Sequence, residues 1–155
     1  VQRLMGGKPM LYGSPSITPA LRATERIHVY LDVSYSMDDV IAALYGAMRT
    51  CEQWMHREVH LFSTTVSDIS FKQLKEGVIV SGGGTKIDCV AQHVQTHRVK
   101  RALLLTDGYV GELSEETKDV FKGIALVVGL AGNSSTSQHL AGIARKCETL
   151  ATDMP

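Results

Sequence analysis

The sequence has no excess of charge of either sign and no long apolar run, and both absences argue against whole classes of protein. Its 155 residues include sixteen basic and sixteen acidic side chains, so net charge gives no indication of nucleic acid or an anionic membrane as partner. No apolar run approaches the roughly 20 residues that a membrane-spanning helix needs. With 44% hydrophobic and 21% charged residues, the composition is that of a globular domain with a sizeable core.

Cysteine is also scarce. Cys51, Cys89 and Cys147 are the three in the chain, and no two of them have C-x-x-C spacing. We therefore expect no disulfide framework, and the pattern favours a reduced, cytoplasmic compartment. All three fall in segments with a helix-like pattern, where Cys51 and Cys147 are expected to be core thiols.

Proline is nearly absent beyond the first segment. Three of the four prolines lie within residues 1–25, together with several glycines, which is typical of an arm or linker. Residues 26–155 are then expected to form one domain.

Within that domain, strand-like and helix-like patterns alternate. Strands are predicted at 27–33, 58–63, 66–71, 78–80, 102–105 and 124–128, and helices at 38–56, 86–97, 114–120 and 140–150. This alternation predicts a three-layer α/β/α fold of Rossmann type, with a mostly parallel central sheet and a short antiparallel edge strand at 66–71.

Polar side chains follow three of the predicted strands. Asp32, Ser34 and Ser36 come after the first, Thr85 follows the glycines at 82–84, and Asp107 ends the strand at 102–105. In such folds ligands bind beyond the carboxyl ends of the strands, so these residues are expected at one edge of the sheet. Two carboxylates and three hydroxyls are hard oxygen donors suited to Mg²⁺ or Mn²⁺.

Each of these residues also has an ordinary explanation. Ser36-x-x-Asp39 and Thr85-x-x-Asp88 both match the capping box at a helix start. Asp107-Gly108 is a common turn pair, and three glycines in a row can serve a loop with unusual backbone angles.

Taken in order, D-x-S-x-S, G-G-G-T and T-D-G resemble the von Willebrand factor A domain family, also called the integrin I-domain fold. The resemblance covers residues 26–150. It implies a metal-ion-dependent adhesion site whose ligands are Asp32, Ser34, Ser36, Thr85 and Asp107. It also implies an open position on the ion for a carboxylate of a partner protein. Tyr35 and Tyr109, beside this motif, are candidate partner contacts, with packing against loop backbone as the alternative.

The same resemblance implies a non-enzymatic protein-binding module. Some intracellular members work beside AAA+ ATPases, which favours a bacterial, intracellular multiprotein assembly with such an ATPase as a candidate partner.

Two other functions are compatible with the motif. A phosphotransfer enzyme of the haloacid dehalogenase type would use Asp32 with Mg²⁺, but Ser34 stands where such enzymes have a second aspartate as general acid. The second of these alternatives is a von Willebrand factor A domain whose site is idle and purely structural. Neither a P-loop nor a G-x-G-x-x-G fingerprint is present, so no nucleotide cofactor is expected.

His93 and His97 are four residues apart on one face of a predicted helix. Zinc needs more donors than these two, and the glutamate of H-E-x-x-H is missing. We therefore expect them to be solvated or half-packed.

Overall fold

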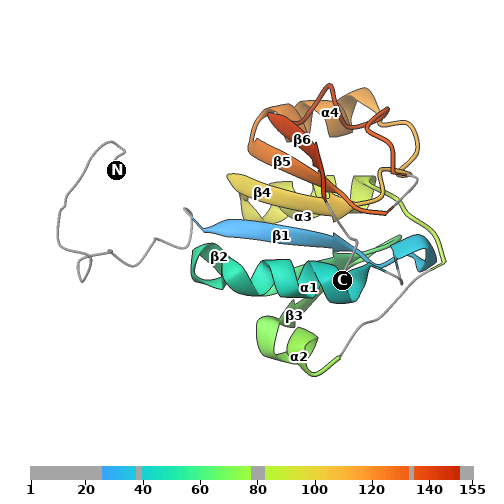
Figure 1. The fold of residues 1–155 in the computed structure, drawn as a ribbon. Helices are drawn as coiled ribbons and strands as arrows, with labels where there is room; N and C mark the ends of the chain where they lie inside the picture. Colours follow the sequence, from blue (N-terminus) through green and yellow to red (C-terminus); the bar gives the residue numbers. More distant parts are fainter. Residues whose placement is uncertain (1–25, 38–39, 78–82, 133–134, 151–155) are drawn as a thin grey trace.

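The computed structural model describes residues 26–37, 40–77, 83–132 and 135–150, and the strands within them form one sheet (Figure 1). The order across the sheet is β3-β2-β1-β4-β5-β6. All neighbours are parallel except β3, which pairs antiparallel with β2 at the edge. The strands are β1 (Ile27–Asp32), β2 (Met55–Phe62), β3 (Val66–Ser70), β4 (Arg101–Thr106), β5 (Ala125–Leu130) and β6 (Lys146–Thr149).

Helices cover both faces of this sheet, which confirms the predicted three-layer α/β/α fold. The helices α1 (Ile41–Thr50) and α2 (Phe71–Lys75) pack on one face, and α3 (Asp88–His97) and α4 (Glu115–Lys122) on the other. Two short 3-10 helices, η3 (Tyr35–Met37) and η4 (Glu52–Trp54), flank α1. Within the described residues, every helix is too short to cross a bilayer.

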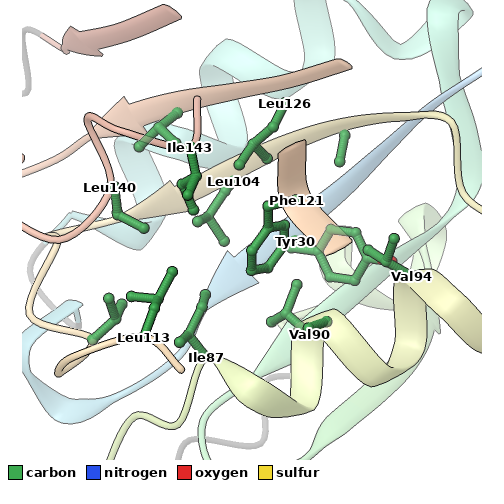
Figure 2. Close-up of a cluster of buried hydrophobic side chains, with 14 of the residues drawn as sticks. Tyr30, Ile87, Val90, Val94, Leu104, Leu113, Phe121, Leu126, Leu140 and Ile143 are labelled. Atoms are coloured by element: carbon green, nitrogen blue, oxygen red, sulfur yellow. The ribbon is translucent and has the colours of Figure 1, made fainter. Parts of the chain in front are cut away.

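The alternation of side chains along β1 assigns each residue to one of two cores. Val29 and Leu31 pack under α1, whereas Tyr30 joins the cluster under α3 and α4. Figure 2 shows this second cluster, with the Tyr30 ring extending toward Val94 of α3. Because Asp32 has the same parity as Tyr30, its side chain belongs to the α3 side of the sheet.

The winding of the chain reverses at β1. From β1 the chain passes through α1 to β2 on one side, and β4, which follows α3 on the opposite face, lies on the other side. Such a reversal opens a crevice at the carboxyl ends of the two strands that flank it. The carboxyl ends of β1 and β4 are therefore where a ligand site is expected.

Two parts of the predicted secondary structure differ from the structure: the end of the first helix and the segment after β3. The first helix ends at Thr50, and Met55, expected on its apolar face, instead begins β2 and pairs with Ile27 of β1. The segment after β3 forms the short helix α2, which the sequence analysis missed. The Ser70 side chain accepts a hydrogen bond from the Gln73 amide and the Gln73 side chain bonds back, a complete capping box.

The predicted helix at 140–150 is wrong. Residues 138–143 form turns, and β6 then pairs in parallel with β5, with Cys147 opposite Val128. Leu140 and Ile143 are buried as expected, but in a turn that packs on the core. The spacing of its apolar residues fits a helix. The segment instead forms backbone hydrogen bonds with the edge strand β5, and a local pattern in the sequence cannot reveal such a pairing.

The three cysteines are free thiols, each half-buried against one of the two cores. Burial raises the pKa of all three, that of Cys89 to about 11, so they are protonated at neutral pH. The predicted arm 1–25, the strand at 78–80, Gly82 and Asp39 lie outside the described residues.

Candidate metal centre

Asp32 and Asp107 stand at the ends of two neighbouring parallel strands. Asp32 is the last residue of β1, and Asp107 directly follows Thr106, the last residue of β4. The register pairs Leu31 with Leu105, which sets Asp32 beside Thr106 at the crevice where the winding reverses. Both carboxylates are buried, Asp32 completely.

Two residues, Thr106 and Ser34, donate hydrogen bonds to the Asp32 carboxylate. One oxygen accepts a hydrogen bond from the Thr106 hydroxyl at 2.6 Å, and the other accepts from the Ser34 amide at 2.9 Å. Burial raises the pKa of Asp32; the two neighbours that donate to it lower this pKa, and the Asp107 charge raises it. A dication at this edge would favour the ionised form of Asp32, so its chemistry fits a metal centre.

Asp107 lies in a turn where both its side chain and its backbone carbonyl accept hydrogen bonds. Its Oδ1 accepts from the Tyr109 amide at 3.1 Å, and its carbonyl accepts from the Thr136 amide at 2.9 Å. The Gly108 amide donates to the Thr106 hydroxyl at 3.1 Å. These bonds fix the position of the second carboxylate relative to β4.

The loop that carries Thr85 reaches the same edge. The amide of Lys86, the next residue, donates to the carbonyl of Ser63 at 2.8 Å, and Ser63 directly follows β2, the other neighbour of β1. A Cβ placed on Gly83 would lie 3.5 Å from the Tyr35 ring. The loop therefore adjoins the D-x-S-x-S turn, and Thr85 is half-buried there.

The structure thus brings Asp32, Ser34, Thr85 and Asp107 to one edge of the sheet. Ser34 is buried immediately after β1. Ser36 lies in η3, and its side chain is outside the described part of the chain.

The alternative role of Thr85 as a helix cap is wrong. Helix α3 begins after Ile87 with no side-chain cap, and the Asp88 carboxylate instead accepts a hydrogen bond from the Thr117 hydroxyl at 2.6 Å. Asp88 therefore links α3 to α4.

Tyr35 and Tyr109 flank this edge as exposed side chains. The exposed fractions are 64% for Tyr35 and 57% for Tyr109, and the Tyr35 ring also lies beside the loop at Gly83. Exposed aromatic side chains are enriched at protein-binding surfaces.

Thr106 is a residue to which the sequence analysis gave no role. It is fully buried and donates the shortest hydrogen bond to Asp32. Its importance follows from the pairing of β1 with β4, which the order of strands along the chain does not reveal.

A second group of polar residues was also missed. Five of the six histidines gather beneath and beside α3, around Asp68 of β3; they are His28, His56, His60, His93 and His97. His93 is half-packed and His97 exposed, as expected for that pair. The additional donors that zinc would need come from β1, β2 and β3.

Burial disfavours the protonated form of three of these imidazoles, those of His28, His60 and His93. It is the main cause that lowers the pKa of His28 to about 3 and of His60 to about 4, and it also lowers the pKa of His93. Burial opposes ionisation of Asp68, but the hydrogen bonds from His60 and His93 help to hold the Asp68 pKa below its ordinary value.

No family model matches this chain, and no curated protein matches it. The similarity to von Willebrand factor A domains therefore rests on the motif residues.

Proposed function

We propose that the chain is a protein-binding module of the von Willebrand factor A type. Its carboxyl edge would hold Mg²⁺ or Mn²⁺ through Asp32, Ser34, Ser36, Thr85 and Asp107, and the ion would dock an acidic residue of a partner protein. The observation that carries this proposal is the placement of two buried carboxylates at the ends of β1 and β4, where the winding reverses.

The donors at this edge would have two roles: some would mainly supply negative charge, and others would coordinate the ion. Asp32 has no exposed surface and already accepts hydrogen bonds from Thr106 and Ser34, so it would contribute negative charge and hold the turn that carries Ser34. Hydroxyl oxygens and the second carboxylate are the remaining donors. Mg²⁺ commonly keeps part of its water shell when a protein supplies few ligands, and such a water is what a partner carboxylate would replace.

The setting we propose is an intracellular assembly, with an AAA+ ATPase as a candidate neighbour. Tyr35 and Tyr109 would form part of the contact, because aromatic side chains are enriched where interfaces are buried.

Isothermal titration calorimetry with Mg²⁺ and Mn²⁺ tests the metal half of the proposal. We expect one equivalent to bind the wild type, and Asp107→Asn to abolish this binding while the unfolding transition is retained. Asp119→Asn, which removes an exposed carboxylate of α4, is the matched control and should bind normally. A wild type without affinity for either ion would end the proposal.

The partner half needs a separate assay. A glutamate-containing peptide should bind in Mg²⁺ and be released by a chelator. A generic phosphatase substrate should show no turnover under the same conditions, whereas Mg²⁺-dependent hydrolysis lost in Asp32→Asn would favour the phosphotransfer alternative.

A further inference from the structure

The register of the sheet places three polar side chains in one row under α3. Tyr30 of β1 pairs with His60 of β2, and His60 pairs with Asp68 of β3. Residues directly opposite in neighbouring strands point to the same face, so the three side chains lie side by side. His93 lies above this row, because its Nδ1 is 2.8 Å from the Tyr30 hydroxyl.

Asp68 is the point where this row and α3 meet. One of its oxygens lies 2.6 Å from His60 Nδ1 and 3.2 Å from His93 Nε2. One carboxylate between two imidazole nitrogens is a donor set that suits zinc and related transition metals.

We propose that His60 Nδ1, His93 Nε2 and the Asp68 carboxylate bind a zinc ion that joins β2 and β3 to α3. The three ligand atoms lie within 4.8 Å of one another. Ligands on tetrahedral zinc with bonds of about 2.1 Å are about 3.4 Å apart, so the His60–Asp68 pair at 2.6 Å has to open by only about 0.8 Å.

The second nitrogen of each histidine already has a partner. His60 Nε2 is 2.9 Å from His28 Nδ1, and His93 Nδ1 faces the Tyr30 hydroxyl. Metal-ligating histidines need such a contact, because it fixes the tautomer and the orientation of the ring.

These two partners suit both the metal-free and the metal-bound state. Without metal, the carboxylate of Asp68 can only accept, so His60 and His93 donate to it and present lone pairs to His28 and Tyr30. With zinc, the proton of each ligand imidazole moves to its other ring nitrogen, the His28 proton moves from Nδ1 to Nε2, and His28 Nδ1 and the Tyr30 oxygen become acceptors. An imidazole nitrogen and a hydroxyl oxygen can each donate or accept, so both contacts persist with donor and acceptor exchanged.

The neighbouring group His28, His56 and His60 is a less suitable ligand set. His56 Nδ1 accepts a hydrogen bond from the Glu58 amide at 3.2 Å, which puts the proton of neutral His56 on Nε2, the nitrogen left to bind a metal. A cavity of about 230 Å³ lined by His56, Glu58 and His97 gives an ion a path from solvent to Asp68, whose side chain is 34% exposed.

Calorimetry with Zn²⁺ alone, on protein first treated with a chelator, tests this site. We expect one equivalent to bind the wild type. His93→Gln and Asp68→Asn should each weaken binding by more than about 100-fold, beyond the 10–100-fold that loss of an outer hydrogen-bond partner costs. Tyr30→Phe should weaken binding by only about 10–100-fold, and its metal-free form should still unfold in one cooperative transition, at lower stability because the hydrogen bond to His93 is lost.

Three control variants discriminate among the alternatives. His139→Gln, which removes the histidine outside the group, and His56→Gln should bind Zn²⁺ as the wild type does. Binding that survives His93→Gln but is lost in His56→Gln would overturn the ligand set, and absence of binding by the wild type would overturn the site. Asp32→Asn alters the proposed Mg²⁺ site and should still bind Zn²⁺, which makes this test independent of the proposed function. Loss of Zn²⁺ binding in Asp32→Asn would contradict the zinc proposal.

Discussion

Gly108 shows how a single residue holds the second carboxylate of the proposed metal centre in place. Its backbone φ is +88°, in the left-handed region, and a Cβ added to it would overlap the carbonyl oxygen of Thr136. The close approach exists because the Thr136 amide donates to the Asp107 carbonyl. The turn after β4 therefore depends on the absence of a side chain at 108.

We predict that Gly108→Ala lowers the free energy of unfolding by at least about 3 kcal/mol, since backbone strain and overlap with Thr136 act together. Gly111→Ala is the matched control: φ there is +78°, but a Cβ would meet nothing within 4 Å, so only the strain of about 1 kcal/mol applies. Urea unfolding measures both. Equal losses for the two variants would show that the contact with Thr136 has no energetic weight.

At the scale of elements, α3 is seated on the sheet through two kinds of contact. Val90, Ala91 and Val94 bury apolar surface, and His93 packs on the ring of His60 with the centroids 4.4 Å apart. Neutral imidazoles can form such a layer, whereas protonated ones would repel one another in a poorly solvated space. The docking of α3 is therefore sensitive to acid.

We predict that the metal-free protein loses stability as the pH falls below about 6.5. The folded-state pKa of His60 is about 4 and that of His28 about 3, so between these values and 6.5 the unfolded chain binds more protons and acid favours unfolding. His60, which is buried, accounts for about 2 kcal/mol at pH 5, and half-exposed His28 adds less.

Asp68 stays ionised over this range, because its pKa is lowered, and its charge offsets part of the loss. Urea unfolding at pH 7 and pH 5, with a chelator present, measures the effect. Equal stability at the two pH values would contradict the assignment of neutral, buried imidazoles.

At the scale of the whole molecule, the alternation of elements was sufficient to predict the three-layer fold, but not every element. The segment 140–150 has a helical spacing of apolar residues and nevertheless contains β6, because the free edge of β5 decides its conformation. The same limit applies to the missed residues: Thr106 and the row Tyr30, His60 and Asp68 are defined by register across strands, which no local pattern encodes.

The placement of the carboxyl-edge residues was easier to predict, since parallel strands put their carboxyl ends together; Asp32 ends β1, and Asp107 directly follows β4. The result is a molecule with oxygen donors at the carboxyl ends of β1 and β4 and imidazoles under α3, on the face of the sheet that carries Tyr30 and His60. Hard and softer cations would then bind at different places on one fold.

The most direct test of the central claim is a titration with paramagnetic Mn²⁺, followed by the amide signals of the ¹⁵N-labelled protein. If one ion is shared by three chain segments at the carboxyl edge, the signals of Ser34, Thr85 and Gly108 should broaden together at the lowest Mn²⁺ concentrations. Asp32→Asn should remove this common response. Broadening centred on exposed carboxylates elsewhere, such as Glu115 and Glu116 at the start of α4, would contradict the account.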